Sequence, residues 1–92
     1  MINITICDDD KHFLKLLNQK IKSYLTNNNQ YSYTIKCFNS VETLLEYNIN
    51  TVNILFLDVR FKTMSGIDAA KILREISSHF ILIFVSSYIE YA

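Results

Sequence analysis

The sequence predicts an α/β protein with a doubly wound parallel sheet, and two observations support that prediction. Short apolar runs alternate with stretches in which apolar residues recur every three or four positions, as strands and helices do in turn. Two of these runs, residues 53–58 and 80–85, are apolar on both faces, which is typical of central strands in a parallel sheet. The 92 residues contain no proline, and the one glycine, Gly66, sits in a turn-like stretch, so we expect one domain over residues 1–92.

The first element is a strand, and a helix follows it. Residues 2–7 alternate between apolar and polar side chains, as a short strand does, and lead into three aspartates. A helix is expected from about Lys11 to the asparagine run at 27–29, which favours a loop. The apolar residues that place one face of this helix against the sheet are Phe13, Leu14, Leu17, Ile21, Tyr24 and Leu25.

The next elements are an edge strand and a short helix. Residues 31–38 alternate again, with Tyr33, Ile35 and Cys37 on one face, which suits an edge strand. Ser40 can then cap a short helix whose apolar residues are Val41, Leu44 and Leu45.

The rest of the chain predicts a strand, a helix and a strand. Residues 53–58 form the third strand, and residues 67–76 form a helix with a stripe of Ala69, Ile72, Leu73 and Ile76. Residues 80–85 read as a second strand that is buried on both faces. Because nothing after Ala92 can pair with that strand, we expect the chain to be C-terminally incomplete and to form a homodimer through this strand's exposed edge.

The composition excludes several function classes. Nine basic and nine acidic residues cancel, which argues against direct binding of nucleic acid or of an anionic membrane by this segment. The N-terminus resembles no signal peptide, and the longest apolar run is too short to span a membrane. Cys7 and Cys37 are interpreted as small buried hydrophobic residues of a cytoplasmic protein.

Carboxylates follow two of the predicted strands. Asp8, Asp9 and Asp10 come after the first strand and Asp58 ends the third, while the hydroxyls of Ser86 and Ser87 follow the fourth. Ligands bind outside the carboxyl ends of parallel strands, so these side chains are expected to meet in one crevice.

A divalent cation would relieve the repulsion between such carboxylates. Mg²⁺ prefers oxygen ligands and is typically held by one or two carboxylates together with a phosphate oxygen. Asp58 is the best candidate for a nucleophile toward phosphorus, because it ends a rigid strand whereas Asp8 to Asp10 begin a loop. A purely structural interpretation exists for each residue taken alone: Asp10 as a helix cap, Ser86 as a strand terminator, Arg60 and Lys62 as solvated loop charges, and Gly66 as a turn residue.

The pattern resembles the receiver domain of bacterial two-component response regulators over essentially the whole chain. Four segments carry the resemblance in order: ICDDD, ILFLDV, MSGID and LIFVSS. It implies a flavodoxin-like receiver fold with strand order 2-1-3-4, and phosphoryl transfer from a sensor histidine kinase to Asp58. It also implies Mg²⁺ at Asp8, Asp9, Asp58 and the backbone carbonyl of Arg60, and a hydrogen bond from Ser86 to the phosphoryl group.

The resemblance extends to an output function and includes three departures. FNSVETLL and SSYIEYA are similar to receivers that precede a LytTR-type DNA-binding domain, which implies a transcription regulator. The family's lysine on a fifth strand, that strand itself and the last two helices are absent from the 92 residues. Lys62 stands where the family usually has proline, and Ser86 where threonine is commoner.

Two other functions remain open on the residues alone. The first is a phosphatase similar to the haloacid dehalogenase family, with Asp8 as nucleophile and Asp10 as general acid. The second is an interaction module with a receiver-like fold that is not phosphorylated. The receiver interpretation predicts a signalling phosphoacceptor and not an enzyme; Asp58 and Gly66 are unexplained by the phosphatase.

Overall fold

Four parallel strands form one sheet in the computed structural model, which describes residues 1–28 and 31–86. The strands are β1 (Ile2–Cys7), β2 (Tyr33–Phe38), β3 (Ile54–Asp58) and β4 (Ile81–Val85). Their order in the sheet is β2-β1-β3-β4, with every neighbouring pair parallel. This order confirms the predicted fold class and puts the ends of β1 and β3 side by side.

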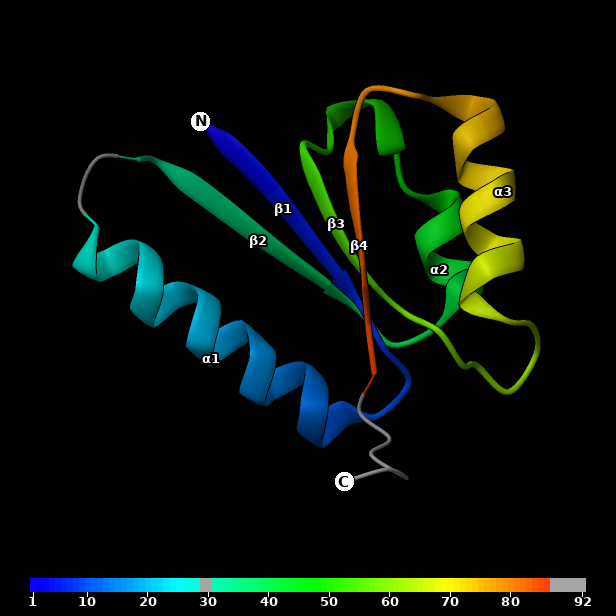
Figure 1. The fold of residues 1–92 in the computed structure, drawn as a ribbon, viewed down its shortest axis with the longest axis horizontal. Coiled ribbons are helices and arrows are strands. Elements are labelled where there is room, and N and C mark those ends of the chain that lie inside the picture. The colour runs from blue at the N-terminus through cyan, green and yellow to red at the C-terminus, as the bar shows by residue number, and fades with distance from the viewer. Residues whose placement is uncertain (29–30, 87–92) are drawn as a thin grey trace.

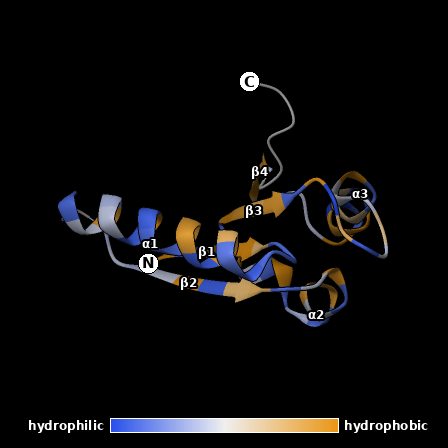
Figure 2. Cartoon of the chain, turned by 90° about the horizontal axis from the view of Figure 1, so that it is seen from below, coloured by the Kyte–Doolittle hydropathy of each residue, from blue (hydrophilic) through white to orange (hydrophobic). Residues whose placement is uncertain are grey.

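The helices lie on both faces of the sheet (Figures 1 and 2). Helix α1 (Lys11–Asn27) runs along one face, and α2 (Val41–Glu46) and α3 (Gly66–Ile76) lie on the other. A 3₁₀ turn at Ile49–Thr51 was not predicted; Asn48 starts it by accepting a hydrogen bond from the backbone N–H of Asn50 at 3.1 Å. Within the described residues no helix is long and apolar enough to cross a membrane.

Side-chain caps start the three helices. The Asp10 Oδ1 accepts from the backbone N–H groups of His12 and Phe13 at 3.0 and 3.1 Å, as its predicted capping role requires. The hydroxyl of Ser40 accepts from the Thr43 N–H at 3.2 Å, and that of Ser65 from the Asp68 N–H at 3.1 Å. These caps fix where each helix leaves the loop at the carboxyl edge of the sheet.

The main core lies between the sheet and helices α2 and α3. Its buried members are Cys7, Val41, Leu44, Ile49, Val52, Leu55, Leu57, Ala69, Ala70, Leu73 and Phe80. On the opposite face, Ile4 and Ile6 of β1 are also buried, although no residue of α1 is. The strands that carry the site are therefore held firmly from the α2 and α3 side.

Three expectations about burial were wrong. The strand β4 is not buried on both faces: Ile81, Ile83 and Phe84 are 60%, 39% and 43% exposed, because β4 is an edge strand of the described sheet. Cys37 is exposed, because β2 is the strand at the other edge. Within the predicted helical stripes, the exposed members are Tyr24, Ile72 and Ile76.

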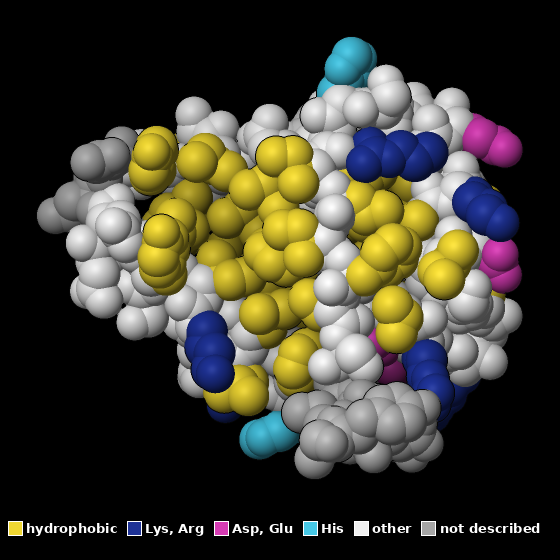
Figure 3. Space-filling model, in the orientation of Figure 1, with side chains coloured by type: hydrophobic (Ala, Val, Ile, Leu, Met, Phe, Trp, Pro, Cys, Tyr) yellow, Lys and Arg dark blue, Asp and Glu magenta, His cyan; other side chains and the backbone are white. Residues whose placement is uncertain are grey.

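The part of the sheet that the described residues leave partly uncovered forms an apolar surface, defined here by the half-buried Ile54 and Phe56 of β3 and the exposed Ile81 and Ile83 of β4. In the strand register Ile54 pairs with Ile81 and Phe56 with Ile83, so the four side chains share one face. A groove along this face is lined also by Ile4 and by Ile21, Tyr24 and Leu25 of α1. Figure 3 shows hydrophobic side chains gathered across this side of the molecule.

Candidate functional site

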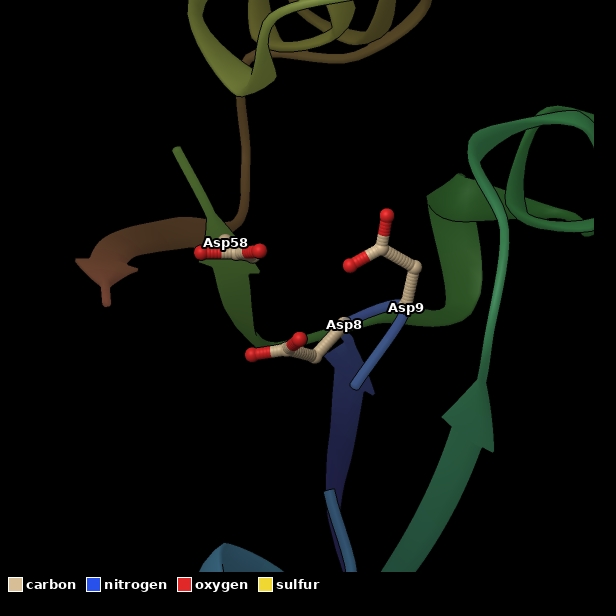
Figure 4. Close-up of side chains that lie close together, drawn as sticks. All are labelled: Asp8, Asp9 and Asp58. Carbon is tan, nitrogen blue, oxygen red and sulfur yellow. The ribbon is translucent and has the colours of Figure 1, made fainter. Parts of the chain in front are cut away.

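Three carboxylates meet where β1 and β3 end (Figure 4). Asp58 is the last residue of β3, and Asp8 and Asp9 directly follow β1. One carboxylate oxygen from each of the three lies within 4.8 Å of the others. Because parallel neighbours bring their carboxyl ends to the same edge, the predicted meeting of Asp8, Asp9 and Asp58 is confirmed.

Asp8 is held rigidly inside the molecule. Its backbone N–H donates to the Phe38 carbonyl at 3.1 Å, which extends the pairing of β1 with β2 by one residue. Its Oδ1 accepts from the backbone N–H of Asp10 at 2.9 Å, while its Oδ2 is buried with no hydrogen-bond partner. An oxygen in that condition is costly unless something else satisfies it.

Asp58 is fixed by the strand and by the loop that follows it. It pairs with Val85 of β4, and the Val59 N–H donates to the Val85 carbonyl at 3.2 Å. The Gly66 N–H donates to the Val59 carbonyl at 2.9 Å, which brings the start of α3 back against the acceptor strand. A side chain at Gly66 would overlap the Asp58 carbonyl, so glycine is required there for space. Its φ is not positive.

Burial and mutual repulsion shift the pKa values of these carboxyls. Burial, joined by the charges of Asp58, Asp9 and Asp10, raises the pKa of Asp8 to about 6, although the Asp10 N–H works in the opposite direction. Burial also raises the pKa of Asp58, opposed by the N–H groups of Arg60 and Val59. The charged forms of both acids are thus less stable here than in water.

These features fit a hard divalent cation. The three carboxylates supply the oxygen ligands that Mg²⁺ prefers, and the unpartnered Asp8 Oδ2 has the acceptor capacity that a cation would use. Asp9 reaches solvent, which leaves room for the water ligands that Mg²⁺ retains.

The other residues predicted for the site lie outside the carboxylate cluster. Asp10 caps α1 and is not part of the carboxylate cluster. Arg60 is exposed and forms an antiparallel bridge with Ser65 that closes the loop between β3 and α3. Ser86 directly follows β4, one residue beyond the partner of Asp58. Ser87 lies outside the described residues.

Sequence reasoning missed two features beside the cluster. The buried Cys7 thiol donates to the Ser40 carbonyl at 3.4 Å, and burial together with the neighbouring carboxylates raises the pKa of this thiol to about 12. The Thr63 hydroxyl donates to the Glu42 Oε2 at 2.8 Å, which joins the β3–α3 loop to α2. Neither could be found from spacing, because the partners are 33 and 21 residues apart and lie in different elements.

Comparison of the sequence with protein families and curated proteins gives consistent matches. The model of the response regulator receiver domain matches residues 4–92. The response regulator protein TodT of Pseudomonas putida is 31% identical over 86 residues, which are 92% of this chain. The chain spans 35% of the length of that relative.

Comparison with solved structures shows the same fold. The non-phosphorylated HemR receiver domain from Leptospira biflexa has a TM-score of 0.77 at 16% identity, over 95% of this chain and 65% of that one. The response regulator DrrB, described as a Thermotoga maritima OmpR/PhoB homologue, has a TM-score of 0.74 at 23% identity, over 98% of this chain and 37% of its own. The MaeR response regulator bound to beryllium trifluoride has a TM-score of 0.66 at 24% identity, over 98% and 70%.

Proposed function

Since this chain belongs to the family of response regulator receiver domains, we propose that Asp58 accepts a phosphoryl group from a sensor histidine kinase in the presence of Mg²⁺. Receiver domains are signalling phosphoacceptors and not enzymes in the usual sense. The observation that supports the proposal most is the convergence of Asp8, Asp9 and Asp58 around the buried, unpartnered Oδ2 of Asp8.

Each residue has a distinct role in this proposal. The carboxylates of Asp8, Asp9 and Asp58 and the carbonyl of Arg60 hold Mg²⁺, whose charge offsets the negative charge of the carboxylates and of a phosphoryl donor. An Asp58 oxygen forms a bond to phosphorus while the bond from phosphorus to the donor's leaving atom breaks, and the leaving atom keeps the electron pair. Ser86 donates a hydrogen bond to the phosphoryl group from the end of β4.

The phosphatase alternative is disfavoured by the position of Asp10. A general acid has to reach the leaving group, but the Asp10 carboxylate accepts two backbone hydrogen bonds at the start of α1. It is also absent from the cluster that contains Asp8. A non-phosphorylated interaction module would have the same fold and would differ from the proposed function only in that Asp58 accepts no phosphoryl group. The phosphorylation experiment separates the two.

The test of the proposal measures cation binding and phosphorylation separately. Calorimetric titration of the 92-residue chain with Mg²⁺ should show one site, which Asp8→Asn weakens strongly. After incubation of the full-length protein with Mg²⁺ and acetyl phosphate, mass spectrometry should find one base-labile phosphoryl group, lost in Asp58→Asn. An adduct that survives Asp58→Asn refutes the assignment, and one on Asp8 supports the phosphatase. Mg²⁺ binding without any adduct supports the interaction module.

Signal output is the next part of the proposal. We infer that the receiver controls a LytTR-type DNA-binding domain in a cytoplasmic transcription regulator, outside these 92 residues. The support is the residue pattern FNSVETLL at 38–45; the second segment, at residues 86–92, lies almost entirely outside the described residues. The sequence encoded after Ala92 tests this inference directly, and a winged-helix output in its place would overturn the LytTR assignment.

Self-association is the partner interaction that the fold favours. We propose that a second copy of this chain pairs with the exposed edge of β4, beside the apolar surface of Ile54, Phe56, Ile81 and Ile83. The strand β4 carries no charge and no proline, whereas the opposite edge strand β2 exposes Lys36. The net charge of the chain is zero, so two copies meet little repulsion.

Matched variants test this association. In sedimentation experiments the wild-type chain should dimerise as its concentration rises, and Ile81→Lys with Ile83→Lys should shift it to monomer. The control pair is Ile72→Lys with Ile76→Lys on α3. Ile72 and Ile76 are 39% and 53% exposed, which matches the 39% of Ile83 and the 60% of Ile81 closely enough for comparison. A wild-type chain that stays monomeric, or a control pair that dissociates the dimer equally, would remove this interface.

A further inference from the structure

The loop between β3 and α3 is attached to the rest of the molecule at more than its two ends. Its base is closed by the Gly66 N–H bond to the Val59 carbonyl and by the bridge between Arg60 and Ser65. On either side of its tip, Phe61 and Met64 pack against the main core. On the outer side, the Thr63 hydroxyl donates to the Glu42 Oε2 at 2.8 Å.

The bond from Thr63 to Glu42 borders a cleft beside the acidic cluster. The cleft has a volume of about 160 Å³, and its walls include Asp9 of the cluster, Glu42 of α2 and Lys62 and Thr63 of the loop. Glu42 is close enough to the cluster to contribute to the raised pKa of the Cys7 thiol. The hydrogen bond therefore connects two walls of the cleft that Asp9 of the acidic cluster also lines.

The conformation of this loop bears directly on Asp58. The loop begins directly after Asp58, and the N–H groups of its first residues, Val59 and Arg60, favour the charged form of the Asp58 carboxyl and so lower its pKa against the effect of burial. The loop contains no proline to restrict its backbone, and its tip residues Lys62 and Thr63 are exposed. An unrestricted segment of that kind has to be ordered by its contacts.

We propose that the hydrogen bond between Thr63 and Glu42 is a tether that holds the β3–α3 loop in the conformation needed to bind Mg²⁺ beside Asp58. Thr63 and Glu42 are then positioning residues: neither touches the cation, and both act through the backbone of residues 59–60. The inference rests on the proposed function only for the identity of the cation. The ordering of the loop itself does not depend on it.

Two substitutions at Thr63 separate the hydrogen bond from side-chain shape. Thr63→Val keeps the branched shape and removes the hydroxyl, whereas Thr63→Ser keeps the hydroxyl. In calorimetric titrations Thr63→Val should raise the dissociation constant for Mg²⁺ by about 3- to 10-fold, the range that one solvent-accessible hydrogen bond supports. Thr63→Ser should stay within about twofold of wild type, as should Thr26→Val, an exposed threonine of α1 that serves as the control.

Substitutions at Glu42 separate the tether from simple charge attraction. In high salt, where the charge of Glu42 is screened, Glu42→Ala should match Thr63→Val, and the double variant should be no worse than Glu42→Ala alone, because both remove the same bond. Glu42→Gln loses the charge but keeps an oxygen that can accept the Thr63 hydrogen bond. Its dissociation constant for Mg²⁺ should therefore approach the wild-type value in high salt, where the contribution of the lost charge is screened. The weakening in Thr63→Val should persist in high salt.

Amide hydrogen exchange of the cation-free chain gives a second readout. Thr63→Val should speed exchange at Gly66 and within residues 60–65, while Thr63→Ser and Thr26→Val leave it unchanged. If Thr63→Val binds Mg²⁺ as wild type does and exchanges at the wild-type rate, the tether is refuted. If the wild-type chain binds no Mg²⁺, the proposed function fails, and the exchange rates still decide whether the tether orders the loop.

Discussion

Gly66 offers the sharpest test of how the site is built, because two physical effects predict opposite outcomes for Gly66→Ala. Gly66 is the first residue of α3 and has no positive φ, so alanine fits its backbone conformation. Helix propensity alone favours alanine over glycine by up to about 1 kcal/mol. On that ground alone the variant should be more stable than the wild-type chain.

Close packing predicts the reverse. A Cβ at position 66 would lie 2.9 Å from the Asp58 carbonyl carbon and from the Val59 Cα, and closer still to the Asp58 carbonyl oxygen. Ordinary contacts begin at 3.4 Å, so the backbone has to separate by at least 0.5 Å, and by more at the oxygen. These neighbours are backbone atoms, which cannot rotate away as a flexible side chain would. Overpacking of this kind costs about 1–3 kcal/mol, which exceeds the propensity gain.

The displacement acts on the phosphoacceptor itself, because the overlapped atoms belong to Asp58 and Val59. A reacting group misplaced by about 1 Å can lose roughly 100-fold in rate, so phosphorylation by acetyl phosphate should fall by about that factor. Urea unfolding and phosphorylation rates measure the two effects, with Lys71→Ala, an exposed site on the same helix, as the control. A Gly66→Ala chain that is more stable than wild type and phosphorylated at its rate would refute the close-packing argument.

Three further predictions concern other residues near the site. Burial raises the pKa of Asp8 from 3.8 to about 6, so the folded chain binds this proton more tightly than the unfolded chain: the stability contribution is complete below about pH 4 and lost as the pH rises through 6. In urea unfolding without Mg²⁺, the free energy of unfolding of Asp8→Asn should therefore rise relative to that of wild type as the pH increases from 4 to 7, by up to about 3 kcal/mol. If the difference between the two chains does not change with pH, the raised pKa of Asp8 is contradicted. In the same unfolding experiments Asp10→Ala should lower the free energy of unfolding by about 1 kcal/mol, whereas Asp10→Ser keeps a capping oxygen and should stay close to wild type. A thiol reagent should modify the exposed Cys37 in the native chain, although burial raises the pKa of this thiol, and should modify Cys7, whose pKa is raised to about 12, only on unfolding; equal rates in the native chain would contradict this.

The sequence predicted the part of the fold that depends on periodicity and on strand ends. The alternating and doubly apolar runs gave the strands, and their carboxyl-terminal aspartates gave the cluster of Asp8, Asp9 and Asp58, because parallel neighbours align their ends. The capping role of Asp10 was also predictable, since its position just before the helix decides it.

Burial and long-range contacts were not predictable from the same patterns. The apolar run of β4 predicts a central strand, but its place at the edge of the described sheet leaves Ile81, Ile83 and Phe84 exposed. An apolar sequence indicates what a strand can bury and not what covers it. The bond from Thr63 to Glu42 depends on how two loops approach each other, which no spacing rule records.

The unpartnered oxygen of Asp8 connects stability with function. A buried carboxylate with an elevated pKa destabilises the metal-free fold at neutral pH, and an apolar or amide side chain in its place would remove that cost. A cation that binds only the folded chain returns the lost stability through its own binding free energy, by an amount that grows with the ratio of its concentration to its dissociation constant. Wild-type stability at pH 7 should therefore rise with added Mg²⁺, while Asp8→Asn should start higher and respond little. If the wild-type chain gains no stability from Mg²⁺, or if Asp8→Asn gains as much as wild type, then the strain at Asp8 is not relieved by a bound cation.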